Sequence, residues 1–373
     1  MSRFHSLLRA LAITLAVLLA WTTAATTAQA APAASGHALL ARIQQLLPDD
    51  AAQRIAKINA ELDVIDPTQY VCDGPSELDL WVADQVSALS EDDITFLMET
   101  GAMSIPAVDL SYFADPADPF YAPTVNAARL MRDFRDGMRF WTPTVPGTRF
   151  LAAHSYVVTD AERIAPSLGL MFDLPEAEAA EMAQLVAEYA STSPGLQHGK
   201  HPLLSFTAFA TSPAIYPDRP TTVVLGDGML QAYAEIGYAD VAGRFILAHE
   251  VGHTVQIAAG EYDVLPTTPE ENRRLELMAD AMAGYFSAHP RGVSMQKKRV
   301  VAAAEVAYWI GDCSFEFLGH HGTPAQRART AAWGAELATT TRPRAKVLTY
   351  AQFLAAFNAA YPTLIAPDAE AAA

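Results

Sequence analysis

Two histidines lie four residues apart in an apolar stretch, and this spacing constrains the fold of the chain more than any other feature. The stretch reads Phe-Ile-Leu-Ala-His-Glu-Val-Gly-His-Thr-Val-Gln, over residues 245–256. Asp240 is a good N-cap and Gly260 a good C-terminal stop, so the pattern predicts one helix over roughly 241–258. Residues four apart share a helical face, so His249 and His253 would point in the same direction.

Two imidazoles on one helical face can both reach one zinc ion, at about 2.0–2.1 Å. Glu250 is rotated around the helix, next to such an ion but not bound to it. There it could act as the general base for a zinc-activated water. The alternative is that both histidines are ordinary core or surface residues. The sequence predicts a catalytic site with one Zn²⁺ per chain, His249 and His253 as ligands and Glu250 as base.

A catalytic zinc site usually has three protein ligands, so a third is needed. One common arrangement places a further histidine shortly after the second, but Gln256 and Ala259 occupy the positions that it would require. The other common arrangement uses a glutamate from the following helix. The sequence Thr268-Pro269-Glu270-Glu271 predicts the start of such a helix, and Glu276 lies in its apolar part.

Burying the carboxylate of Glu276 is costly unless a partner compensates its charge, and a zinc ion would do so. Asp280 lies one turn later on the same face, where it could accept the free N–H of a ligand histidine. The alternative is that Glu276 faces solvent and forms salt bridges with Arg273 or Arg274. Only the ligand interpretation accounts for both acids.

Three segments resemble the motifs of the bacterial neutral zinc metallopeptidase family, which are HExGHxxQ, an ELxAD helix and HGTxxQR. They are HEVGHTVQ (249–256), RRLELMADAMAG (273–284) and HGTPAQR (321–327). The resemblance covers about 220–335 and implies a zincin-like catalytic domain, with His249, His253 and Glu276 as ligands and Glu250 as base. Thr254 stands where the family often has another histidine, and residues 31–195 have no counterpart.

Other site residues are predicted less directly. The negative charge that develops during acyl transfer needs a hydrogen-bond donor, and His321, His320 and Tyr308 are the candidates, each of which could instead be a packed or loop residue. Gln326 and Arg327 are expected to order their loop. The strand expected at 221–225 could pair with an extended substrate.

The patterning predicts an α+β chain that is predominantly helical. We expect a helical N-terminal domain over 31–195, a zincin-like catalytic domain over 196–342, and a C-terminal helix followed by a disordered tail over 343–373. The helices expected outside the motifs lie near 39–47, 55–65, 91–97, 124–140 and 176–190, and the strands near 149–158, 203–210 and 221–225. A turn is expected at Gly226-Asp227-Gly228.

The first 30 residues have the features of an export signal. Arg3 and Arg9 give a positive start, residues 11–21 are almost entirely apolar, and Ala28-Gln29-Ala30 supplies a small-x-small cleavage pattern. The apolar core is short for a bilayer span, so an uncleaved anchor is the weaker interpretation. We expect cleavage after Ala30 and export to the periplasm or beyond, without stable membrane association.

Charge and cysteine content narrow the expected partners. The formal net charge is −17, and such an acidic chain is repelled by nucleic acids. The expected partner is a peptide or protein substrate; the oligomeric state is open. Cys72 and Cys313 could form a disulfide in an exported protein, or remain two buried thiols.

The expected function is hydrolysis of peptide bonds outside the cytoplasm. One alternative is a non-catalytic protein that keeps the metal site as a structural or binding module. Another is a zinc hydrolase that acts on non-peptide amides. A purely structural site has no use for a base at Glu250, which favours the enzyme.

Overall fold

The structure is a computed structural model, and it describes residues 34–47, 75–213, 216–315, 317–343 and 345–367. The export signal expected over 1–30, the helix expected near 55–65 and the tail beyond 367 lie outside the described residues. Within them the chain is predominantly helical with one small sheet, as expected. No described helix combines the length and apolar character needed to cross a membrane.

Thirteen α-helices are described, in two groups along the chain. The first group is α2 (Ala34–Leu46), α4 (Glu77–Ser87), α5 (Glu91–Thr100), α6 (Ile105–Tyr112), α7 (Ala127–Phe140), α8 (Ala161–Phe172) and α9 (Glu176–Thr192). The second is α10 (Asp227–Glu235), α11 (Ala242–Ala258), α12 (Pro269–Ala288), α13 (Lys297–Trp309), α14 (Pro324–Thr340) and α15 (Tyr350–Leu364). Short 3₁₀ helices are η2 (Pro119–Tyr121), η3 (Ser155–Thr159), η4 (Gln197–Gly199) and η5 (Pro202–Ser205).

Strand β3 (Thr222–Gly226) lies in the middle of a three-stranded sheet. On one side β1 (Arg149–Ala153) runs parallel to it, and on the other β2 (Ala208–Ala210) runs antiparallel. The strand predicted at 221–225 is therefore confirmed, but the idea that it pairs with substrate is wrong. Both of its hydrogen-bonding edges are already taken by neighbouring strands.

Three local predictions near the sheet fail. The strand expected near 149–158 ends with β1 at Ala153, because the chain turns there into the 3₁₀ helix η3. The strand expected at 203–210 is reduced to β2, because Pro202 begins η5 and the Nδ1 atom of His201 accepts the Leu203 N–H. No turn follows β3, which leads directly into α10. Its two glycines instead permit close packing, since a Cβ on Gly226 or Gly228 would lie 1.9 Å from a carbonyl oxygen of η5.

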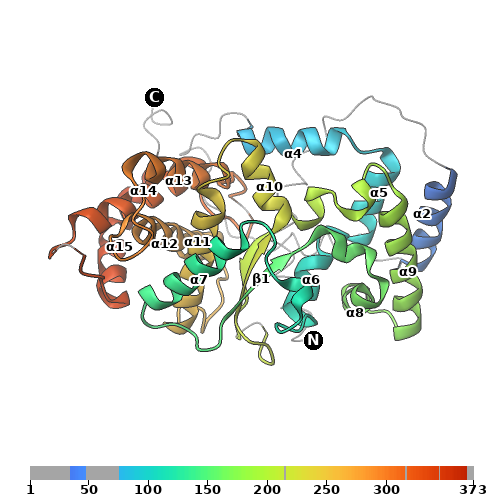
Figure 1. The fold of residues 1–373 in the computed structure, drawn as a ribbon, viewed down its shortest axis with the longest axis horizontal. Helices are drawn as coiled ribbons and strands as arrows, with labels where there is room; N and C mark the ends of the chain where they lie inside the picture. Colours follow the sequence, from blue (N-terminus) through green and yellow to red (C-terminus); the bar gives the residue numbers. More distant parts are fainter. Residues whose placement is uncertain (1–33, 48–74, 214–215, 316, 344, 368–373) are drawn as a thin grey trace.

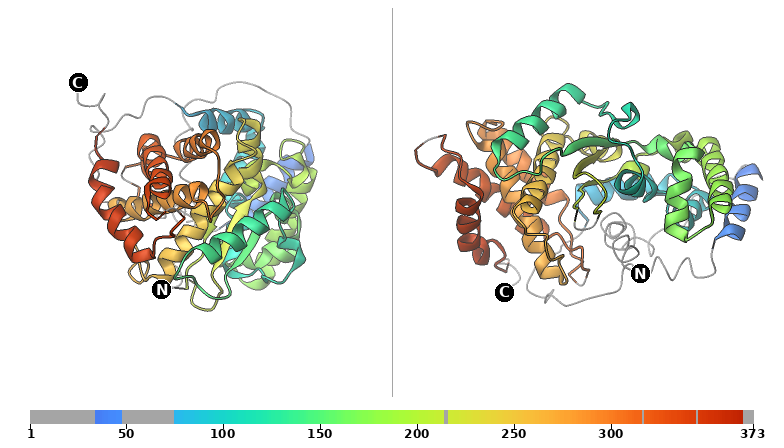
Figure 2. Two further views of the ribbon diagram at one scale, coloured as in Figure 1. Left: turned by 60° about the vertical axis from the view of Figure 1, so that its left-hand side comes forward. Right: turned by 90° about the horizontal axis from the view of Figure 1, so that it is seen from below.

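Helix α11 packs between the sheet and α12, and α12 packs in turn against α14. The contact of α12 with α14 depends on two glycines. A Cβ on Gly284 would lie 2.0 Å from the Ala331 oxygen, and one on Gly334 would lie 2.0 Å from the Ala281 oxygen. α12 and α14 therefore lie side by side, and both belong to the orange and red helices that gather on one side of the molecule in the two views of Figure 2.

The predicted bounds of α11 agree with the structure, but its predicted N-cap is wrong. Val241 occupies the cap position without a side-chain hydrogen bond, while the carboxylate of Asp240 pairs with Arg299 at 3.0 Å. The expected stop is present, because Gly260 follows the helix with a φ of +85°. Thr268 caps α12 as expected, accepting the N–H of Glu271.

The sheet and the main core both extend across the boundary expected between residues 195 and 196. Strand β1 comes from before it and pairs with β3 from after it. The main hydrophobic cluster also contains residues from both sides, from Leu39 to Leu364. In Figure 1 the sheet lies between the helices α11 to α15 and the group that contains α5, α8 and α9. The two-domain division stays a prediction.

Cys313 lies in the segment between α13 and α14 and is disulfide-bonded. The chain contains two cysteines, and the other, Cys72, lies outside the described residues. The alternative of a free thiol at Cys313 is therefore wrong.

Candidate metal centre

Three buried side chains from two helices converge on one point. His249 and His253 come from α11, and Glu276 comes from α12. The Nε2 atoms of the two histidines lie 3.0 Å apart. The carboxylate of Glu276 lies 3.2 Å from Nε2 of His249 and 3.4 Å from Nε2 of His253. The three ligands predicted from the sequence therefore form a group that can bind a metal ion.

The spacing of these atoms fits a small tetrahedral cation. Four ligands about 2.0–2.1 Å from a zinc ion lie roughly 3.3 Å from one another. The three separations here, 3.0, 3.2 and 3.4 Å, fall around that value. Because nitrogen and carboxylate lone pairs repel one another at this range, either protons or a cation must lie between them.

Each histidine is oriented by a different acceptor on its Nδ1 side. The Asp280 carboxylate lies 2.8 Å from Nδ1 of His249, and the Gln256 side-chain oxygen lies 2.8 Å from Nδ1 of His253. The Gln256 amide is itself fixed, because its NH₂ group donates to the Leu275 carbonyl at 2.8 Å. With Nδ1–H donated to these oxygens, both rings direct Nε2 towards the metal position.

The contact predicted between Asp280 and a ligand histidine is thus present, and it has a further partner. Arg327 of α14 donates to both Asp280 oxygens, at 2.7 and 2.9 Å. Its side chain is only 2% exposed. Arg327 also contacts its loop as predicted, donating to the Ile310 carbonyl at 3.2 Å, and in addition it neutralises the acid behind the metal position. Gln326 does order the loop, through a capping box with Thr323.

Glu276 is only 7% exposed, and its carboxylate faces the two histidines rather than solvent. Arg273 pairs with Glu270, and Arg274 lies 3.5 Å from the Glu261 carboxylate. Burial opposes ionisation of Glu276, but the imidazoles of His253 and His249 outweigh it and hold its pKa well below the usual range. The carboxylate is therefore charged at neutral pH, as a metal ligand must be.

The pKa of His249 is shifted upwards by the neighbouring carboxylates. Burial favours its neutral form, but the carboxylates of Asp280, Glu276 and Glu250 outweigh burial and raise its pKa to about 10. Without a cation, the ring therefore keeps a second proton at neutral pH. A metal ion would have to displace it, so metal binding releases a proton.

Glu250 lies beside the ligands rather than among them. It is buried on α11, and its Oε2 atom has no hydrogen-bond partner in the part of the chain that the structure describes. Burial raises the pKa of this carboxyl, and the nearby imidazoles of His249 and His253 oppose the shift. A buried carboxylate oxygen without a donor is costly, and a water molecule would satisfy it.

The structure brings one of the three candidate donors towards the site. His321 lies close enough to Glu276 for their charges to interact, and its side chain is 19% exposed. His320 is fully buried, and its Nε2 atom has no partner among the described residues. Tyr308 lies on the exposed face of α13 and packs against Trp309. Neither residue has a contact with His249, His253 or Glu276 among the described interactions, so the donor roles of His320 and Tyr308 stay predictions.

Two contacts were not predicted from the sequence. The Tyr262 hydroxyl lies 3.1 Å from Nδ1 of His253, and the Asp312 carboxylate lies 3.1 Å from Nδ1 of His321. Tyr262 belongs to the segment between α11 and α12, and Asp312 to the segment between α13 and α14. Neither segment has a periodic pattern that would have revealed where its side chains point.

The site as a whole is a buried His-His-Glu group in which each histidine has an orienting residue on its Nδ1 side. The unpaired Oε2 atom of Glu250 lies beside this group. This is a site that can bind a metal ion and place a base next to it. Comparisons of the chain with protein-family models, with curated proteins and with solved structures found no match.

Proposed function

We propose that this chain is a zinc-dependent peptidase, with His249, His253 and Glu276 as ligands and Glu250 as general base. Two histidines and one glutamate are a ligand set typical of catalytic zinc. The observation that carries the proposal is the buried, unpartnered Oε2 atom of Glu250 beside that set. A site that only stabilised the fold would gain nothing from such an atom.

The chain's own residues divide the work as follows. His249, His253 and Glu276 hold the ion, and Asp280 and Gln256 keep the two rings turned towards it. When bound, zinc supplies Lewis acidity, which polarises a carbonyl and acidifies a water. Glu250 takes the proton of the attacking water and delivers it to the leaving amine. The raised pKa of Glu250 suits a group that must both accept and release a proton.

The outer edge of β2 offers a place for an extended substrate. Thr207 accepts the N–H of Gly226, and the N–H of Thr211 donates to Thr222, both at 2.8 Å. In an antiparallel ladder the residues between them, Ala208 and Ala210, direct N–H and C=O away from the partner strand. β2 is one of the two outer strands of the sheet, the other being β1, and it packs against α11. A peptide can therefore add to β2 as a further strand, close to the helix that carries the histidines.

Replacing Glu250 by Gln tests the proposal. The Gln variant should bind zinc as the parent does and lose about 10²–10⁴-fold in kcat, because the base is lost while the ligands remain. Zinc content by metal analysis and cleavage of a mixed peptide library measure the two properties. Glu188→Gln, at an exposed position of α9, is the matched control and should change neither.

The outcomes separate the proposal from its alternatives. Full peptidase activity in Glu250→Gln would show that Glu250 is not the general base. A parent protein that binds zinc but cleaves no peptide would favour a non-catalytic metal module. A parent protein that cleaves only non-peptide amides would favour a zinc hydrolase that acts on such amides. Action outside the cytoplasm is part of the proposal and depends on the export pattern of residues 1–30.

A further inference from the structure

One carboxylate organises the segment between α13 and α14. The Oδ1 atom of Asp312 accepts the Ser314 N–H at 2.9 Å and lies 2.6 Å from Nδ1 of His320. Its Oδ2 atom accepts the backbone N–H of His321 at 2.9 Å and lies 3.1 Å from Nδ1 of the same residue. Two backbone N–H groups and two imidazole rings thus contact the carboxylate of Asp312. The backbone contacts alone would be enough to form the local turn of the chain.

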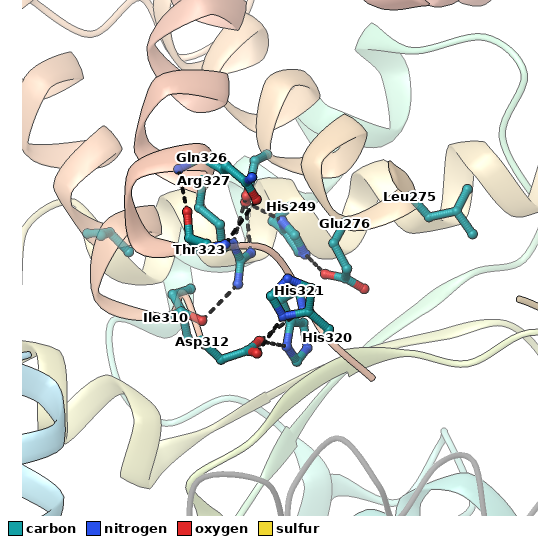
Figure 3. Close-up of polar contacts among 12 residues, drawn as sticks. His249, Leu275, Glu276, Ile310, Asp312, His320, His321, Thr323, Gln326 and Arg327 are labelled. Carbon is teal, nitrogen blue, oxygen red and sulfur yellow. Dashed lines mark hydrogen bonds and ion pairs between the residues drawn. The ribbon is translucent and has the colours of Figure 1, made fainter. Parts of the chain in front are cut away.

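The two bonds from His321 fix its ring at two points. One oxygen of Asp312 holds both the backbone N–H and the ring Nδ1, which restricts rotation of the side chain about both of its bonds. In an imidazole the Nε2 atom lies across the ring from the atom that Asp312 holds. Figure 3 shows His321 with Asp312 on one side and Glu276 on the other.

His320 provides an internal comparison because it shares the same carboxylate. Its ring is 0% exposed and packs against Phe315, 5.1 Å away between ring centroids. Its Nε2 atom is buried and has no partner among the described residues. The partly exposed ring of His321 is the one of the two that the segment presents to the metal centre.

Asp312 is ionised when it holds these rings. Burial would favour its neutral form, but the imidazoles of His320 and His321 keep the pKa of this carboxyl well below its usual range. A hydrogen bond to an ionised carboxylate is shorter and stronger than one between neutral groups. The orientation of His321 is therefore held firmly.

We infer that Asp312 is a positioning residue that holds His321 as an imidazolium, with hydrogen on both ring nitrogens, so that its Nε2–H donates to the substrate carbonyl oxygen as negative charge develops there. The inference rests on the proposed peptidase function. A donor fixed in advance lowers the barrier because it need not reorganise when the charge appears. His321 would touch the substrate, whereas Asp312 would act through His321 alone.

The test is a double-mutant cycle on the zinc-loaded protein. Asp312→Asn should lower kcat about 10–100-fold, with KM and zinc content nearly unchanged. In the His321→Ala background the same substitution should have almost no further effect on kcat, because the group that it positions is gone. Asp240→Asn, at an exposed carboxylate paired with Arg299, is the matched control and should leave kcat unchanged.

Two results would overturn the inference: an unchanged kcat in Asp312→Asn, or an equal loss of kcat in both backgrounds. If Asp312→Asn fails to fold by circular dichroism, His321→Gln decides instead, since it leaves Asp312 its other donors. An unchanged kcat in that variant would also overturn it.

A second readout does not need activity. Long-range ¹H–¹⁵N spectra of the metal-free parent should show hydrogen on Nδ1 of His321, with a signal that shifts or broadens in Asp312→Asn. Identical spectra would contradict the positioning role, even if the protein proved to have no peptidase activity. Failure of the Glu250 test with the expected spectra would instead reject the peptidase function and leave the Asp312 contact in place.

Discussion

The two histidines of the metal centre are oriented by residues of different charge. His249 faces the carboxylate of Asp280, and His253 faces the neutral amide oxygen of Gln256. The centre already contains Glu276 and Glu250, so a second charged acceptor behind His253 would add another buried anion. Arg327 balances the charge of Asp280 and makes its burial tolerable.

Removing Arg327 should therefore destabilise the protein as well as the site. Arg327→Met leaves only His249 to compensate the buried charge of Asp280, and removing one partner of a buried ion pair costs about 3–5 kcal/mol in the free energy of unfolding. Denaturant unfolding in the presence of a chelator measures this without a metal contribution. Arg139→Met removes an exposed arginine whose partner Asp136 is 3.8 Å away, and should change the stability little. Equal effects of the two substitutions would contradict this view of Arg327.

At the scale of elements, the outer strand β2 and a short 3₁₀ helix allow two further predictions. β2 is three residues long, yet its outward N–H groups come from alternate residues, as a ladder requires. The helix η5 comes just before β2 and begins at a buried histidine rather than at a hydroxyl or carboxylate cap. Ala210 in β2 and His201 at the start of η5 can each be substituted so that one contact or one titration is lost while the other contacts of the element remain.

Ala210→Pro should weaken substrate binding while the fold survives. Its N–H points away from β3, so proline removes a contact to the substrate but none to the sheet. Loss of one hydrogen bond of about 1 kcal/mol should raise KM roughly fivefold, with zinc content unchanged. Steady-state kinetics on a peptide longer than the site checks this. Phe209→Pro removes an N–H that faces β3 and should destabilise the protein instead. An unchanged KM in Ala210→Pro would exclude pairing at β2.

His201 should make the stability of the protein sensitive to acid. Its Nδ1 atom accepts the Leu203 N–H, and burial lowers its pKa from 6.5 to about 4. Above pH 6.5 neither the folded nor the unfolded chain protonates this ring, so its contribution is fully present. Between pH 6.5 and about 4 only the unfolded chain takes up the proton, so stability falls as the pH falls.

Melting temperatures of metal-free protein between pH 7.5 and 4.5 test this prediction. His201→Asn keeps a side-chain acceptor for the Leu203 N–H but cannot titrate, so the variant should lose less stability on acidification than the parent does. If the melting temperatures of the two proteins fall in parallel as the pH falls, His201 does not contribute to the acid sensitivity.

At the scale of the whole molecule, the site is assembled from two helices and from segments that lie far apart in the sequence. The sequence predicts α11, α12 and the pair His249–His253 because those residues follow helical periodicity, and it predicts Glu276 because a catalytic zinc ion needs a third ligand and the buried carboxylate needs a partner. Asp280 is predicted from helical periodicity, being one helical turn from Glu276. The predictions of His249, His253 and Asp280 depend on spacing within a helix, which local sequence determines.

The remaining parts of the site depend on long-range packing, which periodicity does not reveal. Arg327 reaches Asp280 only because α12 and α14 approach closely at Gly284 and Gly334. Asp312 and Tyr262 belong to irregular segments, whose side-chain directions depend on the helices around them. The central position of β3 could not be predicted either, because its parallel partner β1 lies more than 60 residues before it.

The central claim is that one metal ion is bound by two imidazoles and one carboxylate from separate helices. Anomalous diffraction at the zinc edge, from crystals grown with zinc, tests it most directly. We predict a single strong peak about 2.0–2.2 Å from Nε2 of His249, Nε2 of His253 and an oxygen of Glu276. No peak at this position, or a peak that Glu276 does not touch, would contradict the account.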